Sequence, residues 1–215
     1  MLTIADQARS PTPLAARPAE TTPRAWSPAE PFAPRWRFTV TEYHRLIAAG
    51  ILHEDDRVEL MGGDLVMMSP IGSKHAAAVK RLNYLLMRSL QDRALIGVQD
   101  PLYLDEHSEP QPDITVLKPR QDFYVHSHPG PNDVLLLIEV ADTSIEYDRD
   151  VKLYAYARAG IVEAWLVDLI DGLIMIHREP SPTGYKLLRK ALPGEMISPT
   201  AFPDLQIAVA DVISE

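Results

Sequence analysis

The chain has 215 residues, a length that suits one globular domain with a sizeable core and is short for two. Hydrophobic residues make up 46% of it, yet no apolar run reaches the roughly 20 residues of a membrane-spanning helix, which argues against a membrane protein. The formal net charge of -9 repels polyanions at long range, so binding of nucleic acid would require a local basic surface or bound metal ions.

The N-terminal sequence has neither the basic start and apolar stretch of a secretory signal nor any cysteine for a disulfide. We therefore expect a cytoplasmic protein. Residues 1–36 contain repeated prolines among alanines, threonines and arginines, without helical or strand periodicity. Because proline removes backbone donors and the segment offers little apolar surface, we expect a disordered tail there, followed by a single domain over 37–215.

The domain is expected to begin with a short helix and a hairpin. Thr39 and Glu42 have capping-box spacing, and Gly50 suits the end of the helix. The runs 57–61 and 64–68 then flank a pair of glycines, which tolerate the positive φ angles of a tight turn between two strands.

A longer helix follows, with Ser73 as its expected cap and its end near Arg93. Aliphatic residues recur in it at spacings of three and four: Val79, Leu82, Leu86 and Leu90. The same helix carries a basic residue every seven positions: Lys74, Arg81 and Arg88. This stripe could touch a phosphate backbone, although a solvated polar face is the simpler interpretation.

Short apolar runs after this helix predict the central sheet, and the run 134–140 is continuous enough for a strand buried on both faces. The expected strands are 94–98, 114–117, 134–140, 163–168, 173–178 and 185–188. A helix is expected over 148–159, and 207–213 suits either a closing strand or a helical turn. This order indicates a mixed α/β fold, and no glycine-rich phosphate loop is present.

Two carboxylates occur at the ends of neighbouring strands. Asp113 precedes the strand 114–117, and Glu139 lies near the end of the most apolar strand, where an unpaired charge would be costly. Carboxylate and carbonyl oxygens are the ligands that Mg²⁺ prefers, so these two side chains and the carbonyl of Val140 make a candidate metal site. Each carboxylate taken alone could also be a solvated strand end.

Three further residues are candidates for the same site. Lys152 follows Asp148 by four positions, which fits an ordinary helical salt bridge or an ammonium directed at the metal site. His75 lies on the inward face of the long helix near its N-terminus, where the helix dipole is expected to disfavour protonation; a neutral core histidine is the alternative. Glu59 could supply another carboxylate or pair with Arg57 or another surface cation.

An ordered series of short motifs extends from about Phe38 towards the C-terminus: Glu59-Leu-Met-Gly-Gly-Asp-Leu-Val-Met-Met-Ser-Pro70, His75, Gln111-Pro-Asp-Ile, Ile138-Glu-Val, Ser144, Asp148, Lys152, Tyr156-Ala-Arg-Ala-Gly-Ile161 and Trp165-Leu-Val-Asp168. This series resembles the Uma-two family of restriction endonucleases. The array of Asp113, Glu139 and Lys152 is similar to the PD-(D/E)XK nuclease superfamily, in its variant with the lysine displaced from the strand.

The resemblance implies a restriction-endonuclease-like core, in which helices flank a mixed central sheet, and metal-dependent hydrolysis of phosphodiester bonds in nucleic acid, which we expect to be DNA. It implies Asp113 and Glu139 as ligands of Mg²⁺ or Mn²⁺ and Lys152 as the catalytic lysine, with His75 and Glu59 as further candidate catalytic residues.

Ala141 stands where the standard superfamily pattern has a lysine. That departure leaves open a catalytically silent binding or assembly module, for which a homodimer is expected. A third hypothesis is a metal-dependent hydrolase of smaller phosphoesters.

Overall fold

The computed structural model describes residues 35–142 and 144–213. The tail predicted over 1–36 falls, up to residue 34, outside the described residues. Within the described part, no helix combines the length and apolarity needed to cross a lipid bilayer.

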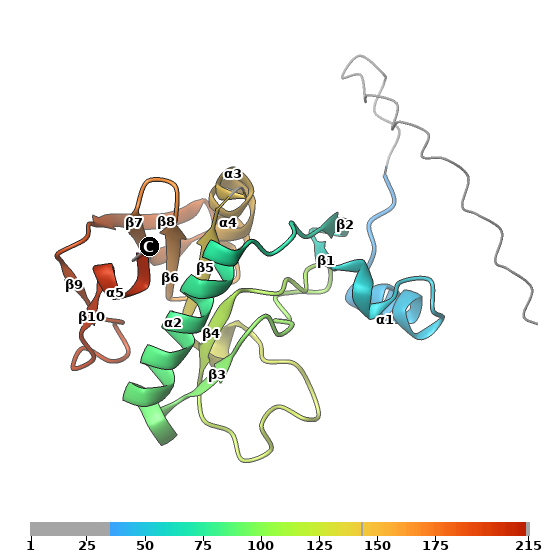
Figure 1. Ribbon diagram of the computed structural model, residues 1–215. Coiled ribbons are helices and arrows are strands. Elements are labelled where there is room, and N and C mark those ends of the chain that lie inside the picture. The colour runs from blue at the N-terminus through green and yellow to red at the C-terminus, as the bar shows by residue number, and fades with distance from the viewer. Residues whose placement is uncertain (1–34, 143, 214–215) are drawn as a thin grey trace, which may run out of the picture. The chain divides into compact units, whose positions relative to one another are not determined.

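A six-stranded mixed sheet lies at the centre, in the order β3-β4-β5-β6-β7-β8 (Figure 1). Its strands are β3 (Leu95–Gly97), β4 (Ile114–Leu117), β5 (Val134–Ala141), β6 (Glu163–Asp168), β7 (Leu173–Ser181) and β8 (Gly184–Ala191). Strands β5 and β6 run parallel, and every other neighbouring pair in this sheet is antiparallel. The mixed α/β fold predicted from the sequence is therefore confirmed.

Helix α2 (Ser73–Leu90) covers one face of the sheet (Figure 1). Its buried side chains follow the predicted spacing of three and four, and each fully buried leucine contributes about 2 kcal/mol relative to an exposed one. The expected cap was wrong by one position, because Gly72 is the N-cap, in an extended conformation, and Ser73 is already helical. The helix ends at Leu90, where a 3-10 turn (Gln91–Arg93) takes over.

The opposite face is covered by one helical segment of three parts. It consists of α3 (Ile145–Tyr147), a π-helical turn (Asp148–Lys152) and α4 (Leu153–Arg158). Leu153 N–H donates to the carbonyl of Asp148, five residues back, which defines the wide turn. The helix predicted over 148–159 therefore starts earlier than expected, and it forms the crossover that joins parallel β5 to β6.

The N-terminal part of the described chain consists of α1 (Val40–Ala48) and the hairpin of β1 (Val58–Met61) and β2 (Asp64–Met67). The predicted capping box is present, since Glu42 N–H donates to Thr39 Oγ1 at 3.2 Å and Thr39 N–H donates to Glu42 Oε2 at 2.9 Å. Strand β1 begins one residue later than expected, because Arg57 has a φ of 30° after a 3-10 turn (Glu54–Asp56).

The C-terminal part contains β9 (Met196–Ile197), β10 (Ile207–Ala208) and α5 (Val209–Ile213). The sequence left a strand and a helical turn open for 207–213, and both occur there in succession. Val209 and Val212 of α5 are buried in the same apolar cluster as α2. The C-terminal segment thus completes the core on the α2 face of the sheet.

Candidate active site

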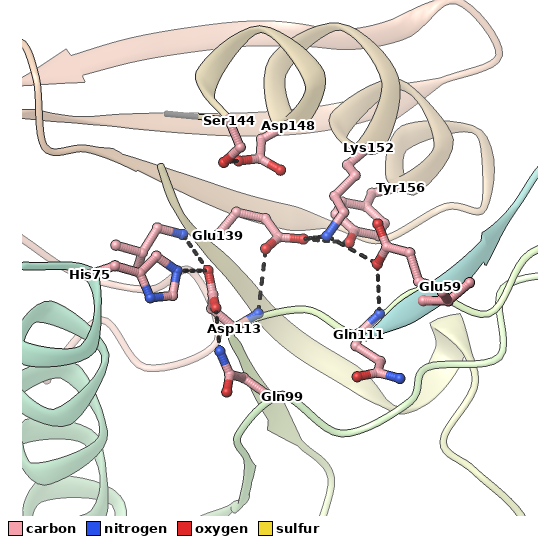
Figure 2. A network of polar contacts seen from close by, with 12 residues as sticks. Glu59, His75, Gln99, Gln111, Asp113, Glu139, Ser144, Asp148, Lys152 and Tyr156 are labelled. Atoms are coloured by element: carbon pink, nitrogen blue, oxygen red, sulfur yellow. Dashed lines mark hydrogen bonds and ion pairs between the residues drawn. The ribbon is translucent and has the colours of Figure 1, made fainter. Parts of the chain in front are cut away.

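A cavity of about 740 Å³ opens at the ends of β4 and β5. The N-terminus of α2, the β1–β2 hairpin and the helical segment after β5 contribute its other walls. All the site residues predicted from the sequence line it: Glu59, His75, Asp113, Glu139, Val140 and Lys152. Figure 2 shows the side chains of five of them converging on one polar network.

Strand register brings the two central carboxylates together. Antiparallel pairing of Ile114 with Ile138 places Asp113, one residue before β4, opposite Glu139 of β5. Asp113 N–H donates to Glu139 Oε2 at 3.3 Å, and Val140 N–H donates to Asp113 Oδ2 at 2.9 Å. The Asp113 and Glu139 residues are only 8% and 2% exposed. The structure thus juxtaposes the two acids that the sequence placed on neighbouring strands.

Asp113 is held as an anion by donors on three sides. Burial raises the pKa of its carboxyl, but hydrogen bonding and charge from His75, together with the Val140 N–H and the Gln99 amide, outweigh burial and lower that pKa overall. The His75 Nε2 to Asp113 Oδ2 distance is 3.0 Å, and Gln99 Nε2 donates to Asp113 Oδ1 at 3.0 Å. An ionised carboxylate in a cavity is ready to bind a cation.

His75 differs from the prediction in its protonation. The sequence suggested that the helix dipole would disfavour the imidazolium. In the structure the hydrogen bond to Asp113 is the largest influence, and it raises the pKa of His75 above its ordinary value despite opposing desolvation. The charge of a carboxylate at 3.0 Å outweighs the partial charge of a helix terminus. His75 Nδ1 is buried without a hydrogen-bond partner among the described residues.

Lys152 bridges two glutamates from different strands. Its Nζ lies 3.2 Å from Glu59 Oε2 of β1 and 3.3 Å from Glu139 Oε1 of β5. Gln111 N–H donates to Glu59 Oε2 at 3.1 Å, and Tyr156 Oη donates to Glu139 Oε1 at 2.6 Å. The helical segment after β5 thus carries the ammonium to the carboxylates, as the metal-site interpretation of Lys152 required.

The other interpretation that the sequence allowed for Lys152, a salt bridge to Asp148 one turn earlier, is not found among the ion pairs of the described residues. The π-helical turn between them alters the angular spacing on which such a pair depends. Asp148 instead accepts a hydrogen bond from Ser144 Oγ at 2.5 Å. Glu59, which the sequence allowed to pair with Arg57 or another surface cation, is 1% exposed and pairs with buried Lys152.

Acidic groups outnumber the single ammonium in this network. Burial raises the pKa of Glu139 to about 8, against the opposing charge of Lys152, with Asp113 and Asp148 adding to the rise. Burial likewise raises the pKa of Asp148. Burial lowers the pKa of Lys152, but Glu139, Glu59 and Asp148 outweigh it and raise that pKa overall. Lys152 is therefore cationic. When Glu139 is ionised, the carboxylates of Glu59, Asp113, Glu139 and Asp148 outnumber the Lys152 ammonium and the His75 imidazolium, and a metal ion could neutralise the surplus negative charge.

Three residues that take part in this network had no role predicted from the sequence: Tyr156, Gln111 and Gln99. Tyr156 lies four residues after Lys152, and that helical spacing could have placed both side chains on one face. Gln111 acts through its backbone N–H, which no side-chain pattern reveals. Gln99 follows β3 and has a φ of 56°, a backbone conformation that a glutamine in the sequence does not predict.

Comparison with models of known protein families shows to which family this chain belongs. Residues 40–210 match the family model described as "Uma2: Putative restriction endonuclease". The chain belongs to the Uma2 family. The family resemblance predicted from the motif series is therefore confirmed, and membership supports a nuclease function in general.

The Uma2 fold also has a solved counterpart. A crystal structure described as "a putative nuclease belonging to DUF820 from Anabaena variabilis ATCC 29413" matches with a TM-score of 0.64 and 16% identity, covering 82% of this chain and 98% of the other. At that identity the likeness shows the shared fold. A search of curated proteins found no match.

Proposed function

We propose that this Uma2 protein is a metal-dependent endonuclease that hydrolyses phosphodiester bonds in DNA. The observation that carries the proposal is the meeting of Asp113, Glu139 and Lys152 in one cavity, from two neighbouring strands and the helical segment after them. Membership of a restriction endonuclease family supports the same reaction class.

The residues present suit a hard divalent cation. The Asp113 and Glu139 carboxylates and the Val140 carbonyl would hold Mg²⁺ or Mn²⁺, both of which prefer oxygen ligands. Glu59 and Asp148 add negative charge around the same cavity, and Lys152 offsets only part of it. When bound, the metal would polarise the scissile phosphate and lower the pKa of an attacking water.

The protein groups have separate roles in this mechanism. Glu59 and Glu139 hold the Lys152 ammonium in a fixed position, where it can stabilise charge that develops on the phosphate. The hydrogen bond from Tyr156 orients the Glu139 carboxylate. His75 and Gln99 position the Asp113 carboxylate and keep it ionised. Tyr156, His75 and Gln99 are therefore positioning residues.

The position of Ala141 is compatible with an active site. Ala141 is fully buried in the apolar cluster that also contains Leu153 and Tyr156 of α4. The ammonium expected from the standard superfamily lysine comes instead from Lys152, whose Nζ lies 3.3 Å from Glu139 Oε1. This contact favours catalysis over the silent binding module that Ala141 left open.

The proposal is tested by cleavage of plasmid and single-stranded DNA with Mg²⁺ or Mn²⁺. Asp113→Ala, Glu139→Ala and Lys152→Ala should each lower the cleavage rate by about 100-fold or more. Asp171→Ala is the matched control, because Asp171 is an exposed acid outside the cavity, and it should cleave like the wild type. Undiminished cleavage by the three site variants would refute the assignment.

Two parallel measurements separate the rival functions. A silent binding module should bind neither metal in calorimetry and cleave no DNA. A hydrolase of small phosphoesters should turn over nucleotides faster than oligonucleotides of the same base composition.

A further inference from the structure

A second cluster of ligating side chains lies outside the acidic cavity. It consists of His44 on α1, Glu109 in the segment before β4 and His128 in the segment before β5. One ligand atom from each residue lies within 4.8 Å of the other two. Three segments distant in sequence thus present two imidazoles and one carboxylate to a common point, and none of the three residues lines the acidic cavity.

The contacts within this cluster are close. His44 Nε2 lies 2.6 Å from Glu109 Oε1, and the rings of His44 and His128 are 6.2 Å apart with an interplanar angle of 72°. The Glu109 side chain is only 3% exposed, whereas that of His44 is 47% exposed. A buried carboxylate at the foot of two accessible imidazoles leaves an open approach for an ion from solvent.

The backbone around the cluster is anchored. Glu109 N–H donates to the Leu60 carbonyl of β1 at 2.8 Å, and Tyr103 N–H donates to the Pro129 carbonyl, next to His128, at 3.0 Å. His44 lies within the capped helix α1. All three ligands therefore stand on or beside hydrogen-bonded backbone.

The donor set selects the ion. Imidazole nitrogens suit Zn²⁺ and its transition-metal neighbours, whereas Mg²⁺ prefers the all-oxygen donors of the acidic cavity. Tetrahedral zinc binds histidine nitrogen at about 2.0–2.1 Å, which puts neighbouring ligand atoms about 3.4 Å apart. That spacing lies between the 2.6 Å of the His44–Glu109 pair and the 4.8 Å limit of the whole cluster.

We propose that His44, Glu109 and His128 bind a zinc ion, with water as the fourth ligand, and that the ion ties α1 to the two segments that precede β4 and β5. The proposal is independent of the nuclease function. The zinc ion would also stabilise one wall of the acidic cavity. Glu109 pairs with Leu60 of β1, and the N–H of Gln111, two residues later, donates to Glu59 in that cavity.

The test is calorimetric titration of the full chain with Zn²⁺, after removal of metals by a chelator and with Mg²⁺ in excess to occupy the carboxylate site. The wild type should bind one zinc ion at the cluster. His44→Ala and His128→Ala should each weaken that binding by about 100-fold or more, since even loss of an outer-shell partner lowers metal affinity about 10–100-fold. His126→Ala is the matched control, an exposed histidine in the same segment as His128, and it should bind zinc like the wild type.

Thermal unfolding gives a second readout that does not involve activity. At free zinc about 100 times its Kd, the Tm of the wild type should rise by about 5–10 °C, and the Tm of the two histidine variants should not rise. In chelator, His128→Ala should unfold at the wild-type Tm because His128 is exposed, whereas His44→Ala should unfold at a lower Tm because it removes the 2.6 Å partner of the buried Glu109 carboxylate. The zinc effect is therefore the difference between the Tm of each variant with zinc and its own Tm in chelator. Asp113→Ala should keep the zinc affinity, which separates this proposal from the nuclease assignment. Zinc binding of equal strength in wild type, His44→Ala and His128→Ala, or no zinc binding by the wild type, would overturn it.

Discussion

Glu139 is the residue on which protons and metal would compete. Burial raises the pKa of its carboxyl to about 8, so at neutral pH the metal-free site keeps a proton there. A metal ion that binds through this carboxylate must displace that proton. The affinity for Mg²⁺ should therefore rise about tenfold per pH unit up to about pH 8 and level off above it.

Calorimetry in buffers of different ionisation enthalpy measures this competition. About one proton should be released per bound metal at pH 7, and almost none at pH 9. An affinity that does not change between pH 6 and pH 8, with no proton release, would show that Glu139 is not a ligand.

His75 is expected to stabilise the fold in a pH-dependent way. Because Asp113 raises its folded-state pKa above the ordinary value of 6.5, the imidazolium–carboxylate pair stabilises the protein fully below about pH 6.5. That stabilisation is lost as the pH rises through the raised pKa. His75→Gln should therefore lower the free energy of unfolding by about 2 kcal/mol at pH 6 and by less at pH 9.

Urea unfolding at the two pH values measures the effect. His126→Gln serves as the control, because His126 is exposed, and its cost should be near zero at both values. A His75→Gln cost that grows with pH would contradict the pairing.

At the scale of elements, the hairpin turn allows a comparison of two adjacent glycines. A Cβ at Gly63 would lie 2.7 Å from Arg37 Cβ, whereas a Cβ at Gly62 would meet nothing within 4 Å. Both have positive φ, so each alanine is strained by about 1–2 kcal/mol. Gly63→Ala should destabilise the protein by more than Gly62→Ala, because only Gly63→Ala adds the clash with Arg37. Thermal unfolding of the two variants measures the difference, and equal Tm values would contradict it.

Elements with strong periodicity could be predicted from the sequence, and elements shaped by tertiary contacts could not. The spacing of Val79, Leu82 and Leu86 specified α2, and the unbroken aliphatic run specified β5. The π-helical turn at 148–152 has no such signature, because it arises where the chain leaves β5 and carries Lys152 to the two glutamates. These contacts with Glu59 and Glu139 also explain why Lys152 does not pair with Asp148.

At the scale of the whole molecule, the net charge of -9 sets the conditions for DNA binding. The basic stripe on α2 is weaker than its spacing suggested, since Arg81 donates to the Val212 carbonyl at 3.4 Å and Arg88 lies over the Tyr84 ring. Its contact with a phosphate backbone stays a prediction for exposed Lys74 and Arg88.

DNA binding should therefore depend on divalent cations more than on the protein's own basic groups. With Ca²⁺, which occupies oxygen sites, gel-shift affinity for DNA should exceed that in chelator by about tenfold or more. Asp113→Asn should abolish this dependence. Equal affinity with and without the cation would assign binding to the protein surface alone.

The central claim is that the acidic cavity holds a divalent ion, and anomalous X-ray diffraction from crystals soaked in Mn²⁺ at about pH 8 tests it most directly. The account predicts an anomalous peak at the Asp113 and Glu139 carboxylates in the wild type and none there in Asp113→Asn crystals. A wild-type map without a peak in the cavity would contradict the metal-dependent mechanism.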